Sequence, residues 1–360
     1  MYRSDVVGSL LRPEYLKEAR QRHESGQISD GEFKPVEDRA VDEAVALQER
    51  AGIDVITDGE TRRYAFYGHL IDALEGFDKL GGWAIPFRNE EGEELTLQRP
   101  VVVSRLRRKR HMCAEEFTYL RARTTRAAKT TLISAQQAAA YYDREKSSAA
   151  YADIDAYLAD LVDILRGEVE ELIRLGCTYI QIDSPQYTAL LDPDLREGYR
   201  KRGNDPDRLL DLSIEMDNAV IGNHASGITF GLHLCRGNNQ SKFYASGDYG
   251  PITKVFRKTK FQRFLLEYDD ERSGGFEPLD QVPEDRSVVL GLVSSKKPTL
   301  ESKEELKRRI NEASAVISKE RLALSPQCGF ASTIEGNLLT QNDQEAKLRL
   351  VAETAREVWG

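Results

Sequence analysis

Short runs of consecutive apolar residues alternate with longer amphipathic segments along most of the chain. Within each short run, neighbouring positions are hydrophobic together, a pattern typical of β-strands that are buried on both faces. The amphipathic segments repeat their apolar residues at helical spacing. The short runs predict eight strands, at residues 5–9, 53–60, 129–134, 179–183, 228–233, 264–269, 287–293 and 321–328.

The segments between these runs predict helices that would cover a parallel sheet on both faces. They lie at residues 36–51, 151–175, 206–221, 302–317 and 341–358, with a polar helix after residue 13 and a helix or turn near 251–257. Eight strand–helix units in 360 residues favour a closed (β/α)8 TIM barrel over an open doubly wound sheet. The open sheet would need a glycine-rich phosphate turn after its first strand, and the sequence has none of the G-x-G-x-x-G or Walker type. We expect a single α/β domain over residues 1–360.

The alternation is interrupted between the second and third predicted strands. Residues 83–87 and 101–103 are apolar, and they flank an acidic turn that contains Gly92. Two apolar runs on either side of such a turn predict a β-hairpin. We therefore expect an insertion over residues 81–125 that carries this hairpin.

Composition and charge narrow the possible partners. The net charge of −9 disfavours nucleic acid and anionic membranes, and the basic run at residues 105–110 reads as a solvated face. The chain has no apolar run of the roughly 18 residues that span a bilayer, and its first residues lack a signal-peptide core. The four cysteines are widely scattered, as expected in a reducing compartment. We expect a cytoplasmic enzyme of small molecules, and the sequence leaves its oligomeric state open.

Polar residues follow the predicted strands at their carboxyl ends, which is where a (β/α)8 barrel carries its catalytic groups. Because these ends meet at one rim, residues far apart in sequence are expected to lie together. The residues at the strand ends are Ser9, Glu60, Ser134, Asp183, His233, Cys235, Glu267, Lys296 and Cys328.

His233 and Cys235 lie two positions apart at the end of an apolar run, so in a strand their side chains would point to the same face. With Cys328 they supply three soft ligands for zinc, and Glu267 is the expected fourth. Two thiolates and a carboxylate leave such a centre formally at −1, which favours holding a substrate thiol as a nucleophilic thiolate over activating water. The alternative for each cysteine is a small buried core residue.

Two other cysteines have simpler interpretations. His111 and Cys113 repeat the His-x-Cys spacing, but they follow the basic run and no apolar strand leads into them. We do not expect this pair to bind metal. Cys177 begins a predicted strand after Gly176 and is expected to be a core residue.

Glu60 and Asp183 have two interpretations. A carboxylate at a strand end often caps the following helix or accepts backbone N–H groups. Two carboxylates that face one barrel mouth could instead bind the ammonium group of a substrate. The pattern of residues alone leaves both interpretations open.

Six short motifs, in order, resemble the C-terminal catalytic barrel of cobalamin-independent methionine synthase. They are Gly8-Ser9, Asp58-Gly59-Glu60, Gln181-Ile182-Asp183-Ser184-Pro185, His233-Leu234-Cys235, Leu266-Glu267 and Gln327-Cys328-Gly329. The motifs are distributed over nearly the whole chain. Their order and spacing make the resemblance specific, although each motif alone is weak.

The resemblance implies a (β/α)8 barrel, a zinc ion and transfer of a methyl group to a thiol, which in this family is homocysteine with a methylfolate as donor. By position, His233, Cys235, Glu267 and Cys328 resemble the zinc ligands. Ser9, Glu60 and Asp183 resemble the part of the site that binds the amino-acid end of homocysteine. The expected partners are therefore a small-molecule thiol and a methyl donor.

The chain departs from the family in two respects. Its length leaves no room for the N-terminal half of the full-length synthases, so it resembles a single-domain short form. The family also carries an acid–base histidine after the seventh strand, where this chain has Lys296. Because the nitrogen of a methylfolate must be protonated to leave, Lys296 is the candidate catalytic residue and the methyl donor stays open.

Three other functions are compatible with these residues. The first is a zinc-dependent thiol alkyltransferase with another electrophile, such as an epoxide, and a coenzyme M-like thiol, for which Arg62 and Arg63 could bind the anionic end. The second is a zinc-stabilised binding protein without turnover. The third is a metal-free decarboxylase of the uroporphyrinogen type, which would not need His233, Cys235 and Cys328.

Overall fold

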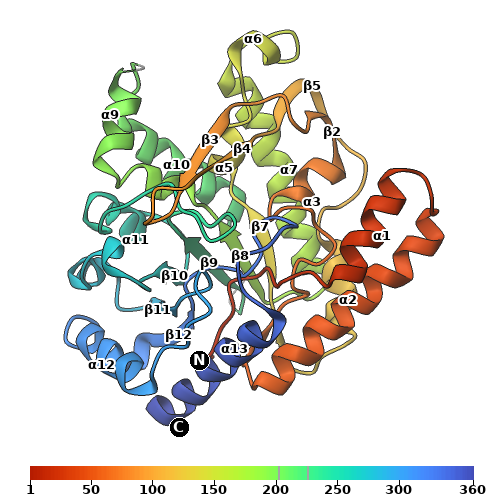
Figure 1. Cartoon of the computed structure of the whole chain (residues 1–360). Coiled ribbons are helices and arrows are strands. Elements are labelled where there is room, and N and C mark those ends of the chain that lie inside the picture. Colours follow the sequence, from red (N-terminus) through yellow and green to blue (C-terminus); the bar gives the residue numbers. More distant parts are fainter. Residues whose placement is uncertain (202, 225–226) are drawn as a thin grey trace.

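The computed structural model describes residues 1–201, 203–224 and 227–360, and its centre is a parallel sheet (Figure 1). Six strands are hydrogen-bonded in the order β12-β11-β10-β9-β8-β7. Neighbours in this sheet are consecutive along the chain, as expected when a helical connection returns each strand to the same edge. The strands are β7 (Thr130–Ile133), β8 (Tyr179–Asp183), β9 (Thr229–Leu234), β10 (Arg263–Glu267), β11 (Ser287–Val293) and β12 (Leu322–Pro326).

Helices surround the sheet (Figure 1) and confirm the predicted α/β class. The longest are α2 (Asp30–Ala51), α7 (Ile154–Arg174), α10 (Pro206–Ile221), α12 (Lys303–Ser314) and α13 (Gln341–Trp359). The shorter ones are α1 (Glu14–Glu24), α3 (Gly68–Ala73), α4 (Ala114–Arg121), α5 (Ala135–Ala139), α6 (Arg144–Ser147), α8 (Gln186–Ala189), α9 (Pro193–Lys201) and α11 (Lys254–Lys258). Four 3₁₀ turns complete the described segments: η1 (Gly250–Ile252), η2 (Glu271–Ser273), η3 (Glu277–Gln281) and η4 (Lys319–Arg321).

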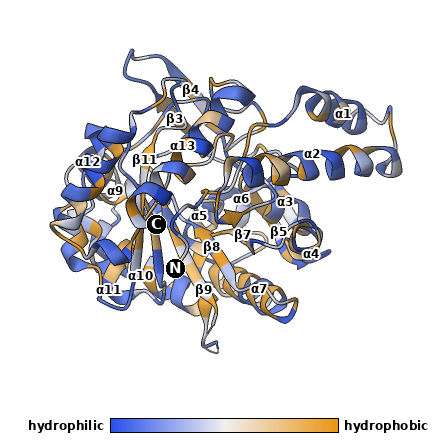
Figure 2. Cartoon of the chain, turned by 90° about the horizontal axis from the view of Figure 1, so that it is seen from below, coloured by the Kyte–Doolittle hydropathy of each residue, from blue (hydrophilic) through white to orange (hydrophobic). Residues whose placement is uncertain are grey.

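The start of α2 differs from the prediction by six residues, because the helix begins at Asp30 and not at residue 36. Ser29 caps it: its side chain accepts from the Glu32 N–H, and the Glu32 carboxylate accepts from the Ser29 N–H. The first turns of α2 are mostly polar, and their apolar residues Phe33 and Val36 pack with α1 and not with the main core. Figure 2 shows α1 and α2 extending to one side of the molecule.

The predicted first strand, residues 5–9, is not a regular strand. Ser4 forms a parallel bridge with Leu324 of β12, and the Leu10 N–H donates to the Gly59 carbonyl at 2.9 Å. Between these points side chains replace the backbone ladder, since the Asp5 carboxylate accepts from the Val6 N–H at 2.9 Å. The second predicted strand shortens to β1 (Val55–Ile56), which pairs in parallel with β6 (Ala127–Ala128).

The hairpin pairs differently from the prediction. β3 (Ala84–Arg88) pairs in antiparallel fashion with β4 (Glu94–Gln98), whereas β5 (Val101–Arg108) pairs with β2 (Leu74–Asp78). Asn89 closes the turn tightly, because its side chain accepts from the Glu93 N–H at 2.8 Å and its carbonyl from the Gly92 N–H at 3.2 Å. The residues directly after the turn therefore return along β3, and the buried Val101 and Val102 join the main core.

Apolar residues concentrate on the strands and on the helix faces that pack against them (Figure 2). Within the described part of the chain, no helix is both long enough and apolar enough to cross a bilayer.

A network of charged and polar side chains lies buried between the strands, around Asp5 and Lys129. The Lys129 Nζ is 2.7 Å from the Asp5 Oδ1 and donates to the Gln181 Oε1 at 2.7 Å. Arg263 and the Tyr179 hydroxyl contact the other oxygen of Asp5, at 3.3 and 2.9 Å. The Gln181 amide in turn donates to the Asp183 Oδ1 at 2.7 Å. A continuous chain of hydrogen bonds therefore joins the interior to Asp183.

Asp217 on α10 gives a prediction about pH and stability. Its carboxylate is fully buried and accepts from the Tyr187 hydroxyl at 2.9 Å, and burial raises its pKa from 3.8 to about 7. The unfolded chain is thus ionised, and the folded chain protonated, between these values, so this residue makes stability fall as pH rises through that window. One pH unit in this window changes the free energy of unfolding by about 1.36 kcal/mol. The stability of Asp217→Asn relative to the parent, measured by urea unfolding, should therefore be about 3 kcal/mol higher at pH 8 than at pH 5. The control is Asp163→Asn, an exposed residue, whose stability relative to the parent should be the same at both pH values. The same result for Asp217→Asn would contradict the prediction.

Candidate metal and substrate site

Two strand ends bring three metal-binding side chains together. His233 lies on β9, Cys235 follows its last residue, and Cys328 lies two residues beyond β12. One ligand atom from each lies within 4.8 Å of the others, and all three side chains are buried. Neither ring nitrogen of His233 has a hydrogen-bond partner, although both are buried. Buried imidazole and thiol groups with free ligand atoms fit a soft ion such as zinc.

The electrostatics of the cluster favour a thiolate at Cys328. Its pKa lies well below the usual value because it accepts a hydrogen bond from Cys235 and faces the positive charge of His233, which outweigh burial. The pKa of Cys235 is correspondingly raised by that hydrogen bond and by burial. Since the thiolate is the metal-binding form of cysteine, the cluster is already suited to a cation.

Glu267, the expected fourth ligand, lies at the end of β10 and is fully buried. Its Oε2 accepts from the Arg236 N–H at 2.5 Å, and its Oε1 lies 2.9 Å from the Lys296 Nζ. Burial alone would raise its pKa, but Lys296 and Arg236 lower the pKa to about 2. Glu267 is therefore an ionised carboxylate next to the cluster, outside the group of atoms within 4.8 Å. Its role as a ligand stays a prediction.

Lys296 does not line the cavity that contains the cluster. Its Nζ lies 2.9 Å from Glu267 and 3.0 Å from Asp269, and it borders a separate hollow together with Arg272. Burial would lower its pKa, yet Asp269 and Glu267 raise the pKa above the usual value for lysine. An ammonium held by two carboxylates suits the positioning of Glu267 better than proton transfer to a substrate. The catalytic role expected for Lys296 stays an untested prediction with little support from this geometry.

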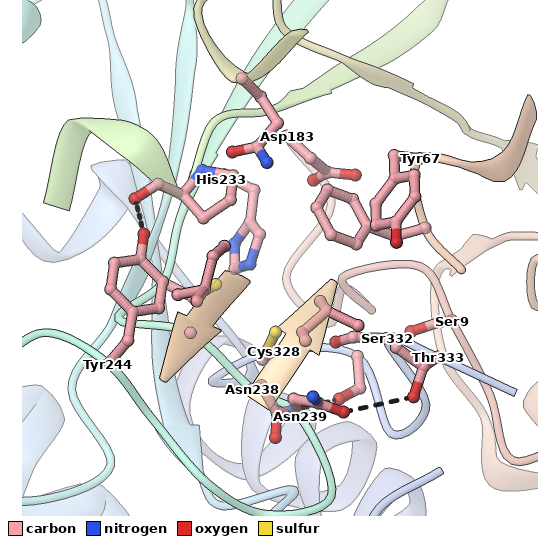
Figure 3. A pocket seen from close by; sticks show the side chains of 18 of the residues that line it. Ser9, Tyr67, Asp183, His233, Asn238, Asn239, Tyr244, Cys328, Ser332 and Thr333 are labelled. Atoms are coloured by element: carbon pink, nitrogen blue, oxygen red, sulfur yellow. Dashed lines mark hydrogen bonds between the residues drawn. The ribbon is translucent and has the colours of Figure 1, made fainter. Parts of the chain in front are cut away.

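The cluster opens into a cavity that also contains the three residues predicted to bind substrate. Ser9, Glu60 and Asp183 line it together with His233, Cys235 and Cys328. Figure 3 shows Ser9, Asp183, His233 and Cys328 around one space, although they come from four distant segments. Six of the eight site residues predicted from the sequence thus line one cavity, whereas Glu267 and Lys296 do not line it.

Glu60 is held in an unusual backbone conformation. Its φ is 53°, in the left-handed region that a non-glycine residue rarely adopts, and the preceding Gly59 has a φ of 70°. Arg12 supports this turn by donating to the Glu60 carbonyl at 2.8 Å. The Thr131 hydroxyl donates to the Glu60 Oε1 at 2.7 Å, while the buried Oε2 has no partner. This free carboxylate oxygen can accept a hydrogen bond from a ligand in the cavity.

Asp183 ends β8 on another side of the same cavity. Its pKa is raised to about 7, chiefly by burial, which outweighs the lowering effect of His233, and the charge of Glu60 contributes to the rise. Two carboxylates in one water-poor cavity repel each other, so a bound cation would relieve both.

The structure also places the arginines and the other cysteines that the sequence analysis considered. Arg62 contacts Asp38 at 2.5 Å and Arg63 contacts Glu116 at 2.6 Å, and neither lines the cavity. His111 contacts Glu168 at 3.0 Å, and the other oxygen of Glu168 accepts from the Cys113 N–H at 2.7 Å, whereas the Cys113 thiol lies beside Arg63. Cys177 is buried and donates to the Tyr179 carbonyl, as expected of a core residue.

Sequence reasoning missed the walls of the cavity. Aromatic side chains, amides and one guanidinium group line it from loops and from the β3–β4 hairpin, and none of them ends one of the eight strands predicted for the sheet. They include Phe66, Tyr67, Phe87, Arg99, Tyr141, Asn238, Asn239 and Tyr244. Thr333 donates to Asn239 at 3.3 Å (Figure 3), which joins two of the wall loops. The pair Asn238 and Asn239, shortly after the His-x-Cys motif, was the one available signal.

A parallel α/β fold with a His-Cys-Cys cluster and two carboxylates in one cavity defines an enzyme of the methionine synthase type. Residues 3–356 match the family model described as "Cobalamin-independent synthase, Catalytic domain", and the chain belongs to this family. Its motif-based resemblance is thereby confirmed.

Several known proteins are similar along almost the entire chain. Bacillus subtilis (strain 168) YxjH, described as uncharacterized, is 34% identical over 99% of this chain and 95% of its own length. A methionine synthase of Pyrococcus abyssi is 26% identical over 91% of this chain and 86% of its own length. A solved Listeria monocytogenes structure, a candidate vitamin-B12-independent methionine synthase, is 26% identical with a TM-score of 0.77, covering 100% of this chain and 98% of that one.

Proposed function

We propose that this protein transfers a methyl group to the thiol of homocysteine and so forms methionine, with a zinc ion as cofactor. The observation that carries the proposal is the single cavity in which a His-Cys-Cys cluster meets two buried carboxylates. A thiol and an ammonium group on one small molecule match these two features. The similarity to the Pyrococcus abyssi methionine synthase supports the same reaction.

We further propose that the strands close into a (β/α)8 barrel within one domain over residues 1–360, with an insertion over 81–125. The Ser4–Leu324 bridge joins the N-terminal segment to β12, and Leu10 joins it to Gly59 beyond β1. The Lys129 N–H donates to the Ile56 carbonyl at 2.9 Å, between β6 and β7. These contacts link the outer strands of the six-stranded sheet through the N-terminal segment and β1, which supports closure.

The proposed zinc ligands are His233, Cys235 and Cys328, with Glu267 as the fourth. When bound, the ion supplies a Lewis acid that lowers the pKa of a substrate thiol and stabilises its thiolate. Glu267 is kept ionised and aligned by Lys296 and the Arg236 N–H, so it can take part in holding a cation.

The residues of the chain bind and orient the amino acid. Glu60 and Asp183 accept hydrogen bonds from its ammonium group, and Ser9 contacts its carboxylate end. Gly329 lets Ser9 approach closely, because a β-carbon at Gly329 would lie 2.0 Å from the Ser9 hydroxyl. The aromatic walls exclude water from the reacting sulfur, and fixing both ends of the amino acid aligns that sulfur with the methyl carbon.

The methyl donor is proposed to be a methylfolate, whose nitrogen would receive its proton from solvent or from a group other than Lys296. The alternative alkyltransfer to a coenzyme M-like thiol has less support. Such a thiol carries a sulfonate, which two carboxylates would repel, and Arg62 and Arg63 are engaged elsewhere. The decisive experiment is a screen of methyl donors with the zinc-loaded protein and homocysteine. If none of the donors yields methionine, the proposal is contradicted.

Glu60→Gln tests the ammonium site. The change removes one charge from the cavity while keeping the shape, so we expect the KM for homocysteine to rise about 10- to 100-fold, the range of a charge-assisted hydrogen bond. Zinc content should be unchanged, because Glu60 lies outside the cluster. The matched control is Glu18→Gln on the exposed face of α1. An unaltered KM would remove Glu60 from the substrate site.

A further inference from the structure

The β3–β4 hairpin brings a guanidinium group into the same cavity. Arg99 follows β4 directly, and it lines the cavity together with Ile85, Phe87 and Leu97 of the hairpin. The hairpin is fixed in place, because Arg88 and Phe243 exchange two backbone hydrogen bonds of 2.8 Å each. Phe87 also packs edge-on against Tyr244, with ring centroids 5.5 Å apart. Figure 3 shows two strand arrows beside Cys328 in this view of the cavity.

Arg99 has no anionic partner among the residues that the structure describes. Its Nη1 and Nη2 point at Gln186, whose amide oxygen, once turned toward them, accepts at 3.2 and 2.5 Å. Its Nε is buried without a partner. Burial lowers the pKa of Arg99, and the groups that oppose this effect are tyrosine hydroxyls, including Tyr141 and Tyr244. The half-buried guanidinium of Arg99 therefore has only neutral groups around it in this cavity.

Charged groups rarely remain buried without a countercharge unless a ligand supplies it. The carboxylates of the cavity do not serve this purpose, since Glu60 lies 3.7 Å from Arg63 instead and no ion pair among the described residues joins Arg99 to Glu60 or Asp183. The cavity thus carries two acidic residues at one place and an arginine on the hairpin. The distance between the acidic residues and the arginine suits either two ligands of opposite charge or one ligand with oppositely charged ends.

We propose that Arg99 binds an anionic group, carboxylate or phosphate, of the methyl donor, whose planar body packs against the aromatic wall of the hairpin side. This inference rests on the proposed function and specifies its second substrate. The hairpin side of the cavity, lined by Ile85, Phe87 and Leu97, carries none of the residues proposed to bind homocysteine, so it is open to a second ligand. Arginine presents a planar fork that matches carboxylate or phosphate in two parallel hydrogen bonds.

Benzoate and benzamide test this proposal as a pair of probes with the same planar shape and different charge. The zinc-loaded full chain is titrated with each probe by calorimetry, with and without saturating homocysteine. We expect benzoate to bind at least tenfold more tightly than benzamide. Arg99→Gln should abolish that preference, Arg99→Lys should retain part of it, and Arg88→Gln, on the exposed part of the same hairpin, should leave it intact.

Equal binding of the two probes to the parent protein would overturn the proposal, as would an undiminished preference in Arg99→Gln. Displacement of benzoate by homocysteine would also overturn it, because Arg99 would then bind the carboxylate of the amino acid. Thermal melts of each variant check that the fold is retained, and Arg99→Lys provides the test if Arg99→Gln fails to fold. Benzoate binding requires no methyl transfer, so failure of the donor screen and failure of this titration are distinct results.

Discussion

Cys328→Ser is expected to abolish both zinc binding and methionine formation. Parent protein should contain about one zinc per chain, since three buried ligand side chains lie together and the ionised Glu267 is the proposed fourth ligand. The serine hydroxyl is neutral at the pH where Cys328 is a thiolate, so the ion loses its strongest anionic ligand. We expect zinc content below about a tenth of the parent value and activity reduced more than 100-fold, measured by elemental analysis and by methionine release.

Cys177→Ser is the matched control for this change. Cys177 is equally buried, but its thiol only donates to the Tyr179 carbonyl, which a hydroxyl can also do. Zinc content and activity should therefore stay close to the parent values. If Cys328→Ser retained a full complement of zinc, the cluster would not be the metal site. If it lost zinc and remained active, the ion would be structural.

Lys129→Met is expected to destabilise the protein by about 3–5 kcal/mol, the range for removing one partner of a buried ion pair. Lys129 and Asp5 are both fully buried, and the change leaves the Asp5 carboxylate with Arg263 and Tyr179 alone. Urea unfolding at neutral pH measures the difference. Lys258→Met on the exposed surface should change the free energy of unfolding by less than about 0.5 kcal/mol.

The same variant should also affect the substrate site, because Lys129 holds Gln181, which donates to Asp183. We expect a raised KM for homocysteine in the fraction that remains folded. A loss below about 1 kcal/mol would mean that Arg263 compensates Asp5 without help from Lys129.

The sequence predicted the strands of the central sheet well because each is buried on both faces. β8 and β11 match their predicted bounds, since Tyr179–Asp183 and Ser287–Val293 are short segments that are mostly apolar and almost entirely buried. The ends of such strands are also where polar residues stand out, which is why His233, Cys235 and Cys328 could be identified. These residues could be grouped without knowing how the strands pair, because the carboxyl ends of parallel strands lie at the same edge of a sheet.

The parts that sequence reasoning missed depend on contacts between distant segments. The partner of β3 was mispredicted because Val101 and Val102 are more hydrophobic than β4, and their burial against the core is visible only in three dimensions. Lys296 was singled out by its place after the seventh predicted strand, yet its contacts with Glu267 and Asp269 depend on how β10 and β11 pair. No sequence motif pointed to Arg99, because the residues that it meets in the cavity lie in distant loops.

The pairing of the β3–β4 hairpin has a consequence for how such enzymes can diverge. Its two strands hydrogen-bond to each other and not to the central sheet, so the hairpin can change sequence without altering a single sheet contact. The cluster and the two carboxylates are built on the sheet ends and would be left untouched. Exchanging residues 81–100 between relatives should therefore transplant the choice of one co-substrate while the other is inherited unchanged, which makes this segment a module for engineering.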